Sequence, residues 1–280
     1  DYNEGFVMPA AIDKRIYFAI GHNQTQHLKL YAANFSESFI APVDRDEASE
    51  VPWANYFIGV IQEMLKIQSF NVPGINCVFG GDIPDGAGLS SSAALEIGFS
   101  YGLNQMLQTG FTEDQLMHLS QMAEHHYVGL ECGIMDQFSS MRGKQDQVMQ
   151  LDCRTLDYEY RPLDLQQYSM VLCNSNVKHS LASSEYNVRR QQCTQGAEFF
   201  QKNGYPEVKN LRDVTTDMLE RHKNEMDPVV FRRCHHVIHE NQRVSETGKA
   251  LEQGNHEEVG ELLYQSHNSL SDKYEVSCEE

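Results

Sequence analysis

Residues 84–96 read Pro84-Asp85-Gly86-Ala87-Gly88-Leu89-Ser90-Ser91-Ser92-Ala93-Ala94-Leu95-Glu96, and this stretch decides how the chain is interpreted. Two glycines and three consecutive serines precede the helix-forming residues Ala93 to Glu96, and this order predicts a loop that leads into the N-terminus of a helix. Free backbone N–H groups and the positive end of the helix dipole meet there, and both favour a phosphate group. Gly86 and Gly88 let the backbone approach an anion closely, because they have no Cβ.

The same loop also permits a plainer interpretation. The serines could cap the helix after a glycine turn, or one hydroxyl could instead bind a metal ion that bridges phosphates. The loop is not a Walker A motif, because no Gly-Lys-Ser or Gly-Lys-Thr follows the glycines. Alone, it leaves a structural role and a nucleotide-binding role open.

The composition narrows the class of protein. A chain of 280 residues allows one large or two ordinary domains. Its net charge of −18 argues against nucleic acid or an anionic membrane as the main partner, since no basic stripe is available to neutralise phosphates. No apolar run reaches about 18 residues, so no membrane span is expected.

Seven scattered cysteines, with no C-x-x-C pair, are typical of the reduced thiols of a cytoplasmic protein. The chain opens at Asp1 with neither an initiator methionine nor a signal peptide. We therefore read it as a fragment of a longer protein.

Hydrophobic periodicity predicts strands early in the chain and helices late, which indicates an α+β protein. The expected strands are 6–12, 15–20, 28–34, 75–79, 149–152, 158–163 and 169–173. Helices are expected from near residue 53, after the glycine-serine loop and from the capping box at 112–115, and then over 184–203, 227–250 and 255–268. The spacing of Gly98 and Gly102 predicts close packing against another element. A boundary near residue 165 gives two domains, 1–165 and 166–280.

Four further segments are unusual in combination. They are Asp1-Tyr2-Asn3-Glu4-Gly5-Phe6-Val7-Met8-Pro9 with the residues that follow to Asp13, Gly133-Ile134-Met135-Asp136-Gln137-Phe138 a short gap after Glu124-His125-His126, Ser183-Ser184-Glu185-Tyr186-Asn187-Val188-Arg189-Arg190, and Ser266-His267-Asn268-Ser269-Leu270 with Tyr274-Glu275-Val276-Ser277.

Together with the glycine-serine loop, these segments resemble the galactokinases of the GHMP kinase superfamily from the first residue to the last. The resemblance implies a two-domain α+β fold with the active site between the domains. It also implies that ATP binds at the loop, through Gly86, Ala87, Gly88, Leu89, Ser90, Ser91 and Ser92.

The resemblance assigns further roles. Asp136 matches the catalytic aspartate, which either removes the proton of the sugar's anomeric hydroxyl or only orients that hydroxyl. Ser92 and Glu124 match a Mg²⁺-binding pair, and Asp1 and Tyr186 match residues that bind the sugar. Without the resemblance, Asp136 is a helix N-terminal acid, Ser92 a cap, Glu124 a solvent-facing helix residue and Tyr186 a packing residue.

The implied activity is ATP-dependent phosphorylation of the anomeric hydroxyl of galactose, which gives galactose 1-phosphate. Two alternatives stay open: a kinase for a related sugar such as N-acetylgalactosamine, and a galactokinase-like sugar sensor without catalysis. The intact Ser92-Ala93 pair and Asp136 weigh against the sensor. The oligomeric state is left open.

Galactokinases carry an arginine and a glutamate-histidine pair just ahead of the position of Asp1, and a second glycine-rich motif near the C-terminal end. The chain has neither. We therefore expect these 280 residues alone to turn over little substrate.

Overall fold

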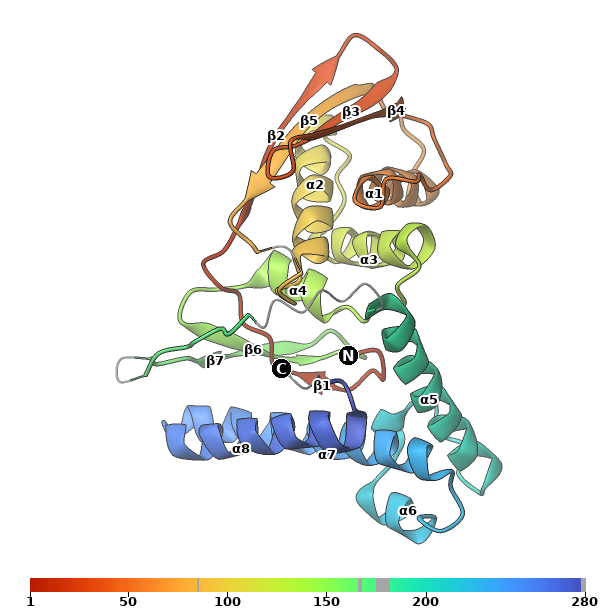
Figure 1. Cartoon of the computed structure of the whole chain (residues 1–280), viewed down its shortest axis with the longest axis vertical. Coiled ribbons are helices and arrows are strands. Elements are labelled where there is room, and N and C mark those ends of the chain that lie inside the picture. The colour runs from red at the N-terminus through yellow and green to blue at the C-terminus, as the bar shows by residue number, and fades with distance from the viewer. Residues whose placement is uncertain (85, 166–167, 175–181, 278–280) are drawn as a thin grey trace. The chain divides into compact units, whose positions relative to one another are not determined.

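A computed structural model describes residues 1–84, 86–165, 168–174 and 182–277 (Figure 1). The chain forms two compact units, Ile12–Arg142 and a second one that combines Asp1–Ala11 with Gly143–Glu280. The expected boundary near residue 165 differs from this division. The difference arises because strand β1 (Phe6–Val7) pairs antiparallel with β6 (Gln147–Asp152), which joins the start of the chain to its second half.

The unit Ile12–Arg142 contains a four-stranded sheet in the order β2-β5-β3-β4. Strand β5 runs parallel to β3 and antiparallel to β2. Figure 1 shows α1 and α2 on one face of this sheet. The elements are β2 (Ile16–Asn23), β3 (His27–Ala32), β4 (Glu37–Pro42), α1 (Ala54–Ile67), β5 (Gly74–Gly81), α2 (Ser91–Leu107), α3 (Glu113–Ala123), a π-helical turn (Glu124–Val128) and α4 (Met135–Arg142).

Alternating residues of β3 and β5 point to the helices and form the core of this unit. Leu28, Leu30, Ile75 and Cys77 are each at most 2% exposed. Helix α2 packs so closely on β2 that a Cβ at Gly98 would overlap the ring of Phe18 and one at Gly102 would overlap Ile20. The close packing predicted from the two glycines is confirmed.

The second unit combines a three-stranded sheet, β1-β6-β7, with a group of helices. Helix α7 contacts all three strands, and the side chain of its Asn241 accepts a hydrogen bond of 2.9 Å from the backbone N–H of Phe6. The elements not yet named are β7 (Tyr158–Pro162), α5 (Ala182–Lys202), a 3₁₀ turn (Leu211–Asp213), α6 (Thr216–Arg221), α7 (Pro228–Glu252), α8 (His256–Ser269) and a π-helical turn (Leu270–Tyr274). Buried residues of α5 and α7, among them Cys193, Phe200 and Cys234, form its core.

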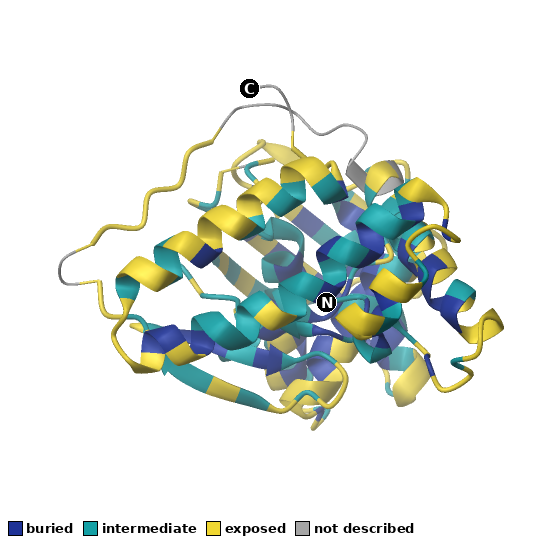
Figure 2. Cartoon of the chain, turned by 90° about the horizontal axis from the view of Figure 1, so that it is seen from below, coloured by how far each residue is buried: buried dark blue, intermediate teal, exposed yellow. Residues whose placement is uncertain are grey.

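Most predicted elements are confirmed, one strand is shorter than predicted and one is absent. The first strand is limited to Phe6–Val7, and residues 169–173 form no strand. In Figure 2 they lie in the exposed yellow trace between two grey segments, and Val171 is 74% exposed. A strand pattern produces a strand only where another strand supplies hydrogen bonds, and no described residue supplies them here. Within the described residues, no helix is both long and apolar enough to cross a membrane.

Candidate active site

The glycine-serine loop joins the end of β5 at Gly81 to the start of α2 at Ser91, as the sequence predicts. Gly86 and Gly88 have φ angles of 67° and 69°, in the left-handed region that favours glycine. A Cβ at either position would meet open space, so the backbone conformation rather than crowding explains the two glycines. Asp85 lies outside the described residues.

Ser90 occupies the N-cap position of α2, yet its side chain does not cap the helix. Its φ of 52° is left-handed, a conformation that non-glycine residues rarely adopt and that tends to occur at functional sites. The hydroxyl donates instead to the side chain of Asp136. The expectation that a serine hydroxyl caps this helix therefore does not hold at Ser90.

Ser92 lies in the first turn of α2, and its hydroxyl donates a hydrogen bond to the carboxylate of Glu124. Glu124 begins the π-helical turn that follows α3, and it is only 2% exposed. The alternative of a solvent-facing Glu124 is therefore wrong. Short π-helical segments occur often at functional sites, where they change the direction of a side chain.

Burial is the main cause that raises the pKa of Glu124 above its ordinary value. Hydrogen bonds from Cys132, Ser92 and Gln137 oppose this rise, whereas the negative charge of Asp136 adds to it. A cation between these acids would favour the ionised form of Glu124.

The donor set at Ser92 and Glu124 fits Mg²⁺, because a hydroxyl and a carboxylate are hard oxygen ligands. Mg²⁺ usually takes one or two ligands from protein and the others from phosphates and water. Among the residues that the structure describes, no three of His, Cys, Asp and Glu gather into a metal site. A metal here would therefore depend on phosphate oxygens for most of its ligands.

Asp136 lies in the first turn of α4, where the helix dipole favours a carboxylate. Burial raises the pKa of Asp136, and the hydrogen bond from Ser90 acts in the opposite direction. The two serines of the loop thus contact the two acids: Ser90 contacts Asp136, and Ser92 contacts Glu124.

A cavity of about 500 Å³ opens beside the start of α2. Its aromatic walls are Trp53, Tyr56 and Phe79, and it extends to Ser91 and Ser92. Trp53 is the only tryptophan of the chain. The sequence predicted a helix that starts near residue 53 and gave no sign of this cavity.

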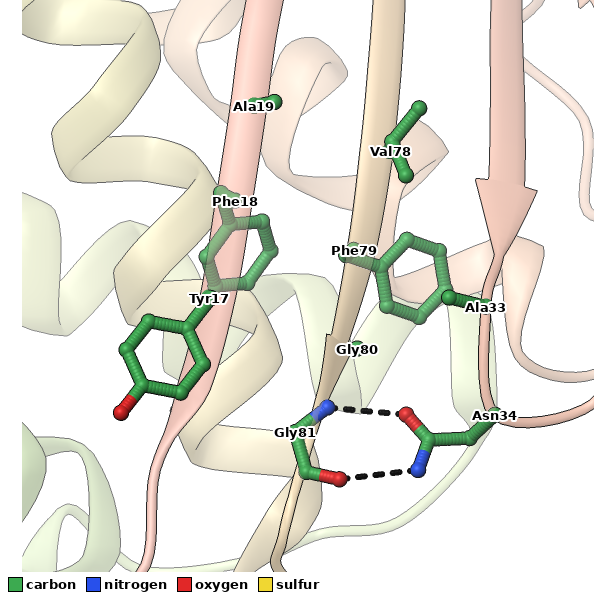
Figure 3. Close-up of a pocket in the computed structure, with 9 residues that line it drawn as sticks. All are labelled: Tyr17, Phe18, Ala19, Ala33, Asn34, Val78, Phe79, Gly80 and Gly81. Atoms are coloured by element: carbon green, nitrogen blue, oxygen red, sulfur yellow. Dashed lines mark hydrogen bonds between the residues drawn. The ribbon is translucent and has the colours of Figure 1, made fainter.

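Asn34 fixes the point at which β5 gives way to the loop (Figure 3). Its side-chain amide donates to the carbonyl of Gly81 and accepts from the N–H of Gly81, both at 2.8 Å. A Cβ at the neighbouring Gly80 would lie 2.8 Å from the amide oxygen of Asn34. Asn34 thus serves as an additional strand partner, a role that its sequence context did not reveal.

Asp1 and Tyr186 belong to the unit that includes the first 11 residues, and Tyr2 contacts both of them. The N–H of Tyr2 donates to a carboxylate oxygen of Asp1 at 2.8 Å. The ring of Tyr2 packs edge to face on Tyr186, with 5.1 Å between the centroids. The hydroxyl of Tyr2 bonds that of Tyr274, which lies 3.4 Å from the sulfur of Cys193. The two residues expected to bind sugar are therefore held by one partly buried network that centres on Tyr2.

Known proteins resemble this chain over its whole length. Residues 55–144 match the family model of the GHMP kinases N terminal domain, and residues 1–22 match the galactokinase galactose-binding signature. The galactokinases of Thermotoga maritima and Thermosipho africanus are each 38% identical to the chain over 281 residues, which cover 100% of the chain and 75% of each relative.

Solved structures agree with these relatives. The crystal structure of Lactococcus lactis galactokinase complexed with galactose matches with a TM-score of 0.93 and 32% identity, covering 100% of this chain and 72% of that one. A mevalonate kinase matches with a TM-score of 0.55 at 15% identity, which shows a shared fold alone.

Proposed function

The chain belongs to the galactokinase family of ATP-dependent sugar kinases, and from that premise we propose that it phosphorylates galactose at the anomeric hydroxyl. The products are galactose 1-phosphate and ADP. The observation that supports this most is the meeting of Ser90 with Asp136 and of Ser92 with Glu124 at the start of α2. In that arrangement one loop binds the phosphates, contributes a metal ligand and bonds the catalytic acid.

We assign the nucleotide to the loop and the adjoining cavity. The phosphates lie against residues 86–92, because the first N–H groups of a helix have no partner within it and α2 starts at Ser91. The base enters the cavity beside Trp53, Tyr56 and Phe79, whose flat rings suit an aromatic base. No lysine is needed for this mode of phosphate binding.

Ser92 and Glu124 would hold Mg²⁺, which supplies positive charge to the phosphates during transfer. The hydrogen bond between the two side chains brings a hydroxyl oxygen and a carboxylate oxygen together. Ser92 therefore serves the metal site rather than the helix cap.

Asp136 accepts the proton of the anomeric hydroxyl or holds that hydroxyl in line with the phosphate. Its carboxylate is the form required, and Ser90 stabilises that form through its hydroxyl. Asp1 and Tyr186 bind the ring hydroxyls of the sugar, the first as an acceptor and the second through its phenol and ring face. We also assign the protein to the cytoplasm, because all six cysteines with a described state are free.

The test is substrate-dependent ADP release by the protein made from its complete coding sequence. We expect release that requires both ATP and galactose, with a higher kcat/KM for galactose than for N-acetylgalactosamine. A reversed preference would identify the related sugar kinase. Binding of galactose and ATP without any ADP release would identify the sensor and refute the kinase assignment.

A further inference from the structure

Glu124 belongs to a buried group of three polar side chains. The group consists of Glu124, Gln137 and Glu96, which are 2%, 0% and 0% exposed. The side-chain nitrogen of Gln137 donates to Oε2 of Glu124 at 3.1 Å and to Oε2 of Glu96 at 3.2 Å. An amide nitrogen carries two hydrogens, so both of them are used.

The three residues come from the elements that build the site. Glu96 lies one turn after Ser92 on α2, Glu124 begins the π-helical turn, and Gln137 follows Asp136 on α4. Through these bonds Gln137 links its own helix, α4, to α2 and to Glu124, the proposed metal ligand. Buried polar groups at such a junction lose orientation when one partner is removed.

Two of the three hydrogen bonds that side chains donate to Glu124 fall on one oxygen. Gln137 donates to Oε2, and the thiol of Cys132 donates to the same atom at 3.3 Å. These two bonds fix the plane of the carboxylate and leave Oε1 unoccupied by either donor. A metal ligand benefits from this arrangement, because its outer partners orient it without competing for the ion.

The side chains of Gln137 and Glu96 also have complementary hydrogen-bonding groups. The oxygens Oε1 of Glu96 and Oε1 of Gln137 are buried and have no hydrogen-bond partner. A carboxylic acid and an amide can share two hydrogen bonds, N–H to oxygen and O–H to oxygen, and the first of these is present. Burial raises the pKa of Glu96 well above its ordinary value, which favours the protonated form that the second bond requires.

We propose that Gln137 is a positioning residue that orients the Glu124 carboxylate for Mg²⁺, with Glu96 as the buried partner that holds the amide in place. The inference rests on the proposed function, since it assigns Gln137 to the metal site given there. It differs from a purely structural role, in which the three side chains only satisfy one another and stabilise the unit.

The test compares the affinity for ADP with and without Mg²⁺ by calorimetry, so it does not depend on turnover. The ratio of the two dissociation constants measures the contribution of the metal. We expect Gln137→Met, which keeps the volume but removes the hydrogen bonds, to reduce this ratio about tenfold, as loss of an outer partner of a metal ligand typically does. The affinity for ADP in EDTA should stay within about twofold.

Glu96→Gln keeps one donor and one acceptor without charge, so it should leave the ratio unchanged. Gln137→Glu should reduce the ratio, because a third carboxyl group replaces the donor to Glu124. The double variant E96Q/Q137E exchanges acid and amide and should recover part of the loss. This pair keeps the inference testable if Gln137→Met does not fold.

The control is Glu63→Gln, a buried carboxyl of α1 that bonds Lys66 and His126. It should alter stability and leave the ratio unchanged. An unchanged ratio in Gln137→Met, or no recovery in the double variant, would overturn the inference. No effect of Mg²⁺ in the unaltered protein would instead refute the proposed metal pair.

Discussion

The hydroxyl of Ser92 donates a hydrogen bond to the carboxylate of Glu124, which begins the π-helical turn behind α3. The bond joins the phosphate loop to a buried acid from a distant part of the chain. Ser90 makes the same kind of bond to Asp136. Changes in either serine should therefore affect the acids rather than only the helix that the serines begin.

Ser92→Ala should raise the Mg²⁺ concentration needed for half-maximal activity by about tenfold or more, the size of loss typical for residues that support a metal. If Ser92 were only a cap, its loss would cost about 0.5–2 kcal/mol of stability and leave the metal requirement unchanged. Activity measured over a range of Mg²⁺ concentrations, with thermal unfolding in parallel, separates the two roles. The neighbouring Ser91→Ala serves as the control and should have the smaller effect on the metal requirement.

Asp136→Ala should lower kcat by roughly 10²–10⁴-fold if Asp136 acts as a general base. Nucleotide binding should change little, and it can be followed by the fluorescence of Trp53, the only tryptophan, which lines the cavity beside the loop. The exposed Asp157→Ala is the control for loss of a carboxylate. A loss below about tenfold would leave Asp136 only an orienting role, and unchanged kcat would remove it from the mechanism.

Ser90→Ala should move the acid limb of the kcat–pH profile to higher pH. The pKa of Asp136 is raised by burial, and the Ser90 hydroxyl lowers it by stabilising the carboxylate. Removal of that hydroxyl raises the pKa further, so the active carboxylate is lost at a higher pH than in the unaltered protein. Profiles of kcat against pH for the two proteins test the direction, and a limb that stays in place or moves to lower pH would contradict the assigned bond.

Asp213→Asn should destabilise the protein at neutral pH by about 1 kcal/mol, a value reduced for solvent screening of a partly exposed pair. Arg154 donates to both oxygens of Asp213, at 2.7 and 3.1 Å, and its guanidinium lowers the pKa of that carboxyl to about 2. Because the folded pKa is depressed, the stabilisation is present above the ordinary value of 3.8 and is lost as the pH falls towards 2. Urea unfolding from pH 7 to pH 3 should show the difference between the two proteins shrinking, and a constant difference would contradict the ion pair as its cause.

Local sequence signals predicted the elements that carry the site. The glycines and serines of 84–92 predicted a strand–loop–helix unit. The left-handed backbone at Gly86 and Gly88 explains why glycine occupies these two positions. The pairing of β1 with β6 was not predictable, because it joins segments far apart in sequence and depends on no local pattern. For the same reason the apolar residues 169–173 suggested a strand that has no partner among the described residues.

At the site itself, Glu96 and Gln137 show how far the sequence alone predicts contacts. Glu96 is an ionisable residue within the apolar run Ala93-Ala94-Leu95-Glu96-Ile97, and such a placement can signal a buried polar contact. Its partner could not be identified from spacing, since Gln137 arrives from another helix. The resemblance to galactokinases named Ser92, Glu124 and Asp136 one by one, whereas only the three-dimensional arrangement relates them to one another.

The most direct test of the proposed function is the position of the phosphoryl group in the product. The protein made from its complete coding sequence is incubated with ATP, Mg²⁺ and galactose, and the sugar phosphate is examined by phosphorus NMR. We predict a single product whose phosphorus couples to the anomeric proton, formed only when both substrates are present. Bound galactose and ATP without any sugar phosphate, or phosphorus coupled to a different ring proton, would contradict the proposed reaction.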